Sequence, residues 1–574
     1  LLDRAGRREQ AGKWFEKAVE AGQERVDTWL NLIAYQIATG GRKAAEVTLD
    51  RAADALEEPK RTVCLAQGNE MLGRFEEAER HYRNAVAAAP TDADTKRDLA
   101  AFFLRRGQVA QAREPLRQIV DTAADGRPTV VWARRNLAEI MAQNANFRTL
   151  EQAVALVGKN LDRSGRLPPE DMAVQVALLS RRSEPVCWRE AIDLIGKIAD
   201  QRPLTMGEQT QLSELLEKTG RWEEARSGLM AICSAPNAPP AFIALLVEKL
   251  IAHDEIIAAR TWLRPLQKQL PNSPATHALQ ARLALAVNDR EAAVAAARQL
   301  LPAAEAEGVP RDQVVGLAKL LEDLGFAKAA DRIISRLPED STDAIFVKVG
   351  FLGRQKRPDE ALQLLEDHWT KLPLERVLQS AFDVVRHQED PRSHAARLEA
   401  WLTKARREDP GSVMLAVMQA ELREIEGRPE EVERIYRDVL ARKDSQPQLQ
   451  AIVANNLAFH LARPETAAEA RRLVDSAIAE LGPQPDLLDT RGLISLAAGD
   501  TKRALEDLRE AALDPTAVKL LHLACAEFAA GDADAARRTL ESARKKKLLP
   551  SRLSSSDRQR LEQLTEALKT AAAA

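Results

Sequence analysis

The stretch Gly73–Pro90 reads GRFEEAERHYRNAVAAAP and carries the pattern that decides the fold. Its opening glycine is followed by Ala78, then by Tyr82 and Ala85, and the stretch closes on a proline. Positions i, i+4 and i+7 lie on one face of a helix, so these three residues predict a helix with a small–large–small stripe. The glycine before the stripe and the proline after it predict where the neighbouring helices end.

The same frame recurs along the chain at a nearly constant spacing. In the first part, the anchor alanines are Ala11, Ala45, Ala78 and Ala112, at spacings of 34, 33 and 34 residues. In the middle they are Ala191, Ala225, Ala259 and Ala293, each 34 apart, and near the end they are Ala470, Ala504 and Ala536, at 34 and 32. A fixed period of this length is the mark of a repeat architecture, in which each unit packs against its neighbours.

A second helix type precedes each frame and is marked by a leucine followed by a small residue. Examples are Leu99-Ala100, Leu317-Ala318, Leu457-Ala458 and Leu523-Ala524. The small side chain lets the neighbouring helix approach closely. The turn between the two helices holds a glycine, which adopts the left-handed conformation without strain. These glycines are Gly73, Gly107, Gly220, Gly325, Gly427, Gly499 and Gly531.

The period, the turn glycine and the Ala–large–Ala stripe together resemble the tetratricopeptide repeat family over nearly the whole chain. The resemblance implies an all-α, right-handed superhelical solenoid of antiparallel helix pairs, with about sixteen repeats. The segment Asp557–Thr570, DRQRLEQLTEALKT, is amphipathic and follows the last repeat, so we predict a C-terminal capping helix there.

Spacing divides the predicted array into regular and irregular parts. We expect N-terminal repeats over 1–127, irregular repeats with longer loops over 128–202 and central repeats over 203–383. A second irregular stretch is predicted over 384–443, C-terminal repeats over 444–553, and the capping helix with a tail over 554–574. The chain begins at Leu1 without a methionine, so we expect the natural N-terminus to lie upstream.

Composition argues for a helical binding protein and against several other classes. Aromatic residues make up 4% and the net charge is −3, from 83 basic and 86 acidic residues. A nucleic-acid-binding surface needs a basic excess and stacking rings, so nucleic acid is not an expected partner. The sequence has no phosphate-binding loop, nucleophile elbow or HExxH motif, and its four cysteines form no CxxC pair. We therefore predict no enzyme activity, no small-molecule substrate, no cofactor, no metal site and no membrane-spanning segment.

The family resemblance implies that the first helix of each repeat lines a concave face, where peptides bind. The positions beside the leucine–small pair would point inward, and these candidate partner-binding residues are Asn31, Arg97, Asp98, Arg135, Asn136, Asn455, Asn456, Phe459 and Thr490. An asparagine amide both donates and accepts hydrogen bonds and so suits a peptide backbone. The alternative is that Asn31, Asn136 and Asn456 bond within the helices or face water.

A carboxylate clamp of the kind found in co-chaperone members of the family is not predicted. The matching positions hold Asn31, Cys64 and Asp98, and Asp98 would repel a carboxylate. The predicted function is a protein-interaction scaffold that binds partner proteins or extended peptides along its concave face. Two alternatives remain at this stage: a regulatory or substrate-recruiting arm of a larger enzyme, and a self-assembling structural subunit. The alanine- and arginine-rich composition suggests a bacterial-type member. We expect a soluble protein of the cytoplasm or the periplasm, and the sequence does not decide between these compartments.

Overall fold

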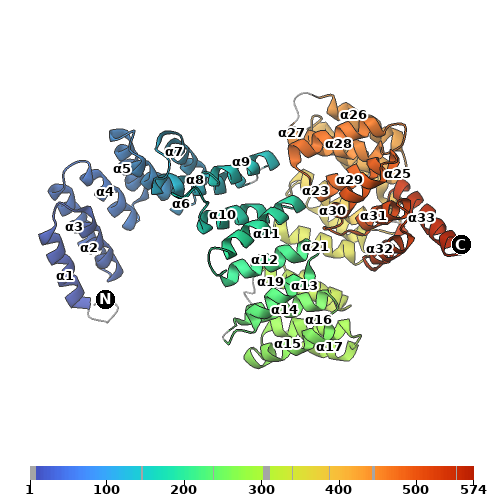
Figure 1. Ribbon diagram of the computed structural model, residues 1–574, viewed down its shortest axis with the longest axis horizontal. Coiled ribbons are helices and arrows are strands. Elements are labelled where there is room, and N and C mark those ends of the chain that lie inside the picture. Colours follow the sequence, from blue (N-terminus) through green and yellow to red (C-terminus); the bar gives the residue numbers. More distant parts are fainter. Residues whose placement is uncertain are drawn as a thin grey trace. The chain divides into compact units, whose positions relative to one another are not determined.

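The computed structural model describes residues 8–143, 146–236, 238–300, 311–338, 341–386, 388–442, 446–550 and 553–573. Within these ranges the secondary structure is helical, with 32 α-helices, one short 3₁₀ helix and no strand (Figure 1). The chain divides into two compact units, Leu1–Leu178 and Leu179–Ala574, which we call the N-terminal and C-terminal units. None of the described helices is both long and apolar enough to cross a membrane.

The helices of the N-terminal unit follow one another with short connections. They are α1 (Arg8–Ala21), α2 (Val26–Ala38), α3 (Arg42–Ala55), α4 (Lys60–Met71), α5 (Phe75–Ala88), α6 (Ala93–Arg105), α7 (Val109–Thr122), α8 (Pro128–Ala142) and α9 (Phe147–Val157). The next helix, α10 (Pro169–Ser180), crosses the boundary between the two units.

The C-terminal unit begins with α11 (Pro185–Ala199). Its first half continues through α12 (Met206–Lys218), α13 (Trp222–Cys233), α14 (Pro240–Ala252), α15 (Ile256–Gln269), α16 (Pro274–Ala286), α17 (Arg290–Arg298), α19 (Arg311–Asp323), α20 (Ala327–Ser335), α21 (Thr342–Arg354) and α22 (Pro358–Asp367). Its second half comprises α23 (Leu374–Arg386), the 3₁₀ helix η1 (Pro391–His394), α24 (Ala395–Glu408), α25 (Val413–Glu426), α26 (Pro429–Leu440), α27 (Pro447–His460), α28 (Ala467–Leu481), α29 (Pro485–Ala497), α30 (Thr501–Ala511), α31 (Ala517–Ala529), α32 (Ala533–Lys545) and α33 (Ser555–Ala573).

Neighbouring helices pack in pairs, as the sequence pattern predicts (Figure 1). The pairs α4 with α5, α27 with α28 and α29 with α30 are among the most closely packed. At Gly492 of α29, an added Cβ would lie 2.5 Å from Cγ of Leu508 on α30. A real Cβ cannot sit so close to another carbon, so a residue without a side chain is needed where these two helices meet.

The anchor alanines lie in the core of the array. Nine of the eleven have no exposed surface, Ala293 is 1% exposed and Ala11 is 4% exposed. The residues beside them are large and also buried, such as Leu49, Tyr82 and Leu508. Each helix pair contributes to a core shared with the next pair, as in the cluster that joins Tyr82 to Phe102 and Val130. The alanine period therefore reports helix contacts, and the predicted tetratricopeptide-type fold is confirmed.

The turn glycines have the predicted left-handed backbone. At Gly73, φ is +72°, and the next amide, that of Arg74, donates to the carbonyl of Asn69 at 2.9 Å. This bond satisfies a carbonyl that the helix end would otherwise leave without a donor. Where a repeat lacks the glycine, Asp254, Asn288 and Lys356 adopt positive φ at the corresponding turn.

The predicted amphipathic helix at the C-terminus lies inside α33. Its Leu564 and Leu568 are 4% and 7% exposed and pack into a cluster with Leu521 of α31 and Leu540 of α32. Helix α33 therefore covers the open end of the last helix pair, which is the role of a cap in a solenoid. The finer division of the chain into regular and irregular parts stays a prediction.

Candidate functional site

The predicted inward residues of the N-terminal unit do not gather into one site. Asn31 of α2 and Arg97 of α6 are exposed, and the Arg97 guanidinium lies 5.6 Å from the centre of the Trp132 ring. Asp98 is half-buried, and this burial raises its pKa. Asn31 lies on α2, whereas Arg97 and Asp98 lie on α6, with the first helix α4 between them, and each side chain has its own surroundings.

The two candidates on α8 already have partners inside the N-terminal unit. Arg135 donates two hydrogen bonds to the carboxylate of Asp171 on α10, from Nε at 2.7 Å and from Nη2 at 2.6 Å. Asp171 is 1% exposed and also accepts from Asn160 at 2.7 Å. Asn136 donates to the carbonyl of Trp132, one turn earlier in the same helix, at 2.8 Å. Bonds within and between the helices therefore account for Arg135 and Asn136.

The other four candidates line one hollow in the C-terminal unit, with a volume of about 360 Å³. The first helices α23, α25, α27 and α29 form it, together with Tyr436 of α26. We call it the C-terminal hollow. Its lining residues are Arg386, Val417, Glu421, Glu424, Tyr436, Asn455, Asn456, Phe459, His460, Asp486, Asp489 and Thr490. The structure thus brings Asn455, Asn456, Phe459 and Thr490 together.

The two asparagines of the hollow differ in how their amides are used. The Asn456 side chain forms a hydrogen bond with the hydroxyl of Tyr436, whose pKa burial raises. The amide oxygen of Asn455 is buried and has no hydrogen-bond donor. A buried acceptor without a donor costs free energy, about 1–3 kcal/mol. Asn455 is therefore an acceptor that the folded chain leaves unused.

Two glutamates of α25 face the hollow one helical turn apart. Glu421 accepts from Nε of Arg386 on α23 at 2.8 Å, yet burial outweighs this pairing and raises the pKa of Glu421. Burial, together with the nearby carboxylates of Glu421 and Asp557, raises the pKa of Glu424 to about 7. Glu424 lies 3.9 Å from Nε2 of His460, whose pKa is lowered to about 4 by burial and by Arg463. His460 is therefore neutral near pH 7 and does not balance the charge of Glu424.

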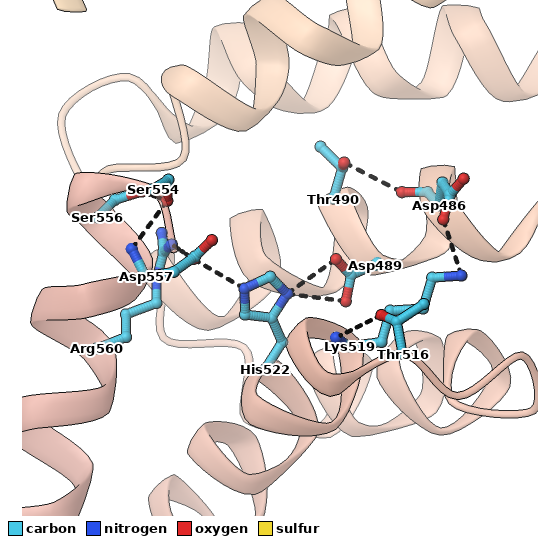
Figure 2. Close-up of polar contacts among 10 residues, drawn as sticks. All are labelled: Asp486, Asp489, Thr490, Thr516, Lys519, His522, Ser554, Ser556, Asp557 and Arg560. Atoms are coloured by element: carbon cyan, nitrogen blue, oxygen red, sulfur yellow. Dashed lines mark hydrogen bonds and ion pairs between the residues drawn. The ribbon is translucent and has the colours of Figure 1, made fainter. Parts of the chain in front are cut away.

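A buried ion network lies beside the hollow and involves His522 of α31 (Figure 2). Nδ1 of His522 contacts Asp489 of α29 at 2.8 and 3.0 Å, and Nε2 contacts Asp557 of α33 at 2.9 Å. His522 has no exposed surface. Since both carboxylates act as acceptors, both ring nitrogens must donate, which requires the charged imidazolium. The network therefore ties the capping helix to two first helices.

Opposite charges in this network balance one another. Burial opposes the charged form of His522, but Asp489 and Asp557 outweigh it and raise its pKa to about 9. Arg560 donates to Asp557 at 2.6 Å, and despite burial the two cations lower the pKa of Asp557 to about 2. Two carboxylates thus face one imidazolium and one guanidinium. Buried charges persist only when paired in this way.

A second ion cluster involves Asp486, which lines the hollow. The Lys519 ammonium is 2.8 Å from Asp486 (Figure 2). It is also 2.9 Å from Asp514. Thr490 is buried, and its hydroxyl donates to the backbone carbonyl of Asp486 at 3.1 Å. Thr490 is therefore a wall residue whose hydroxyl is already used. In the part of the chain that the structure describes, no group of three or more metal-ligating side chains is arranged to hold a metal ion.

Sequence reasoning missed Glu421, Glu424 and His522. His522 stands directly before Leu523-Ala524, as Asn456 stands before Leu457-Ala458, so the rule used for the asparagines also selects it. Glu421 and Glu424 could not be found in this way, because surface helices carry many such glutamates. Their separation by three residues places them on one face of α25, but the neighbouring helices decide that this face lines a hollow.

Comparison with known proteins gives a match to a family model and similarity to solved structures. Residues 71–133 match the family model described as tetratricopeptide repeat. No curated protein matches the sequence. A chain in the structure titled "Crystal structure of APC/C hetero-tetramer Cut9-Hcn1" is similar at 11% identity and a TM-score of 0.37, over 92% of this chain and 98% of that chain.

The family match includes the end of α4, the whole of α5 to α7, and the start of α8. The same helix pairing, buried anchor alanines and left-handed turns continue on both sides of it. Residues 71–133 therefore match the tetratricopeptide repeat family, and the described residues on both sides have the same tetratricopeptide-type fold.

Proposed function

We propose that the protein is an interaction scaffold whose C-terminal hollow binds an extended segment of a partner protein. The observation that carries the proposal is the hollow itself, to which four successive first helices contribute side chains. Its volume of about 360 Å³ lies at the lower end of the range for ligand sites. Such a volume suits a few side chains of a longer segment.

The chemistry of the wall supports a peptide ligand. Phe459 and Val417 supply apolar surface, whereas Asn455 and Asn456 supply amides. A peptide in an extended conformation presents backbone donors and acceptors along its length together with side chains on alternate sides. A backbone amide of the ligand would give the Asn455 oxygen the donor that the folded chain does not supply.

The first helices extend such a surface beyond the hollow. A partner segment longer than a few residues would continue over the neighbouring helices and gain affinity from many weak contacts. The hollow is then the most specific part of a longer binding face. A rigid array also suits this role, because its binding residues are held by the core and need little reordering.

Affinity capture with a matched pair of variants tests the proposal. The full chain serves as bait in an extract of the source cells, beside Asn456→Ala/Phe459→Ala in the hollow and, as the control, Asn272→Ala at an exposed turn before α16. We expect a partner that is retained by the wild type and the control and lost from the double variant. A partner retained equally by all three would place binding elsewhere. Recovery of the chain alone would favour self-assembly, which sedimentation at several concentrations would check.

A further inference from the structure

The C-terminal hollow has more hydrogen-bond acceptors and negative charge than its own donors and cations satisfy. The amide oxygen of Asn455 has no donor. Among the described residues, the basic side chain closest to the Glu424 carboxylate is His460, whose Nε2 lies 3.9 Å away. His460 is neutral near pH 7 and forms no ion pair with Glu424. Asn455 and Glu424 are two independent side chains on two different helices, α27 and α25. Both would gain from a donor that enters the hollow from outside.

The cations around the hollow are already paired with other carboxylates. Arg386 donates to Glu421, and Arg560 donates to Asp557. His522 lies between Asp489 and Asp557, and Lys519 lies between Asp486 and Asp514. Among the residues that the structure describes, none of these four cations lies within 4 Å of the Glu424 carboxylate. The remaining charge in the hollow is therefore negative.

We propose that the hollow accepts a lysine or arginine side chain from the bound partner segment, with its charged end against Glu424 and its alkyl stem along Phe459. This inference rests on the proposed peptide-binding function and adds the chemistry of the ligand. Lysine and arginine both carry an apolar stem and a multi-donor cation, which match an aromatic wall beside a carboxylate. The charged end also supplies the donor that the Asn455 oxygen lacks.

Other ligand groups fit the hollow less well. A carboxylate, including a free C-terminus, would face Glu421 and Glu424 and be repelled. A neutral apolar side chain would cover Glu424 and leave its charge without a partner, which costs free energy. The raised pKa of Glu424 supports the same conclusion, since it shows a carboxylate destabilised by burial and by neighbouring carboxylates. A cation relieves both effects.

Short fluorescent peptides test the proposal, with alternating serine and lysine, serine and glutamine, or serine and glutamate. Fluorescence anisotropy would measure their binding to the full chain at about pH 8 and low salt, because salt screens such contacts. We expect the lysine peptide to bind about tenfold more tightly than the glutamine peptide, since one well-placed ion pair supplies about that factor. The glutamate peptide should bind most weakly.

Two variants locate the effect. Glu424→Gln keeps the shape of the side chain and should remove most of the preference for lysine. The matched control is Glu541→Gln on α32, an exposed position with the same change in net charge, which should leave the preference intact. Circular dichroism would verify that each variant retains its helix content.

The possible failures are distinguishable. Equal affinity for the lysine and glutamine peptides, with both lost in Phe459→Ala, would overturn the cation proposal and leave the hollow as a peptide site. A lysine preference reduced equally by Glu424→Gln and Glu541→Gln would also overturn it, since the effect would then come from overall charge. Binding that is unaffected by Phe459→Ala and Glu424→Gln, or no binding of any peptide, would overturn both this proposal and the hollow as the binding site.

Discussion

Helices α8 and α27 carry nearly the same local sequence and use it in different ways. Arg135-Asn136-Leu137-Ala138 on α8 corresponds to Asn455-Asn456-Leu457-Ala458 on α27. In both, the leucine and alanine are buried. On α8 both polar side chains already form hydrogen bonds: Arg135 donates to Asp171, and Asn136 donates to a backbone carbonyl of its own helix. On α27 the Asn455 oxygen has no donor, and both asparagines line a hollow.

The next first helix explains the difference. After α8, Asp171 of α10 pairs back with Arg135. After α27, Asp489 of α29 pairs forward with His522 of α31 and takes part in the network that holds the capping helix. The Asp489 carboxylate is therefore paired with α31 and does not pair with a side chain of α27. A motif inside one repeat therefore does not show whether its polar residues are available to a ligand, since this depends on the repeat that follows.

The largest expected effect comes from breaking the network that draws Asp489 away. His522→Gln removes the cation between two buried carboxylates, and we expect it to lower the free energy of unfolding by about 3–5 kcal/mol at pH 7. Hydrogen exchange would locate the loss in α29, α31 and α33, because stability varies locally along a repeat array. His277→Gln on α16, where the ring contacts Gln280, is the control and should change little.

The pH dependence of this effect has a definite sign. The pKa of His522 is raised to about 9 from an ordinary value of about 6.5. Its contribution to stability is therefore fully present below about pH 6.5 and is lost as pH rises through about 9. Urea titrations should show the wild type and His522→Gln far apart at pH 7 and closer together at pH 10. An equal gap at both values would contradict a charged imidazole.

A smaller effect is expected from breaking the corresponding pair in the N-terminal unit. Arg135→Gln leaves Asp171, which is 1% exposed, without its main cation. Because the Arg135 side chain is partly exposed, we expect a loss of about 2 kcal/mol. Hydrogen exchange in α8 and α10 would measure it. Arg97→Gln at an exposed position of α6 is the control, and an equal loss of stability there would show that the ion pair of Arg135 with Asp171 makes no specific contribution.

Binding of the lysine peptide at the hollow should depend on pH. Since the pKa of Glu424 is raised to about 7, acidification from about pH 8 to about pH 6 neutralises it and should weaken binding of the lysine peptide by up to about tenfold. His460 stays neutral and His522 stays charged over this range. The other charged or titratable groups around the hollow are Arg386, Glu421, Tyr436, Arg463, Asp486, Asp489, Asp514, Lys519, Asp557 and Arg560. Anisotropy titrations at the two pH values would test this, and a dependence that persists in Glu424→Gln would contradict it.

The smallest expected effect is on stability at Asn455 itself. Asn455→Ala removes a buried amide oxygen that has no donor in the folded chain, and the relief of that cost offsets the packing lost with the side chain, so the free energy of unfolding should change by less than about 0.5 kcal/mol. Thermal unfolding of the variant beside the wild type would measure this. A loss comparable to that of Arg135→Gln would show that Asn455 is engaged within the fold, and the contrast between the two helices would fail.

Much of the fold could be predicted from the sequence, and part of the site could. Anchors such as Ala45 and Ala504 mark helix contacts because only a small side chain fits there, so their period appears directly in the sequence. Four of the nine predicted binding residues line the hollow, because the position beside Leu457-Ala458 faces inward. Arg135 and Asn136 occupy similar positions but have internal partners. The sequence does not distinguish the two outcomes.

The sequence by itself therefore determined the repeat, its helix pairs, its left-handed turns and the helix that caps its end. These depend on contacts between helices that are adjacent in the chain, which the same small and large residues repeat in every unit. Only the tertiary structure decided which polar side chains are already paired and which remain open to a ligand. Such pairs join residues in different repeats, as in Asp489 with His522 and Arg135 with Asp171. Their formation depends on burial and on competing partners, which no single repeat contains.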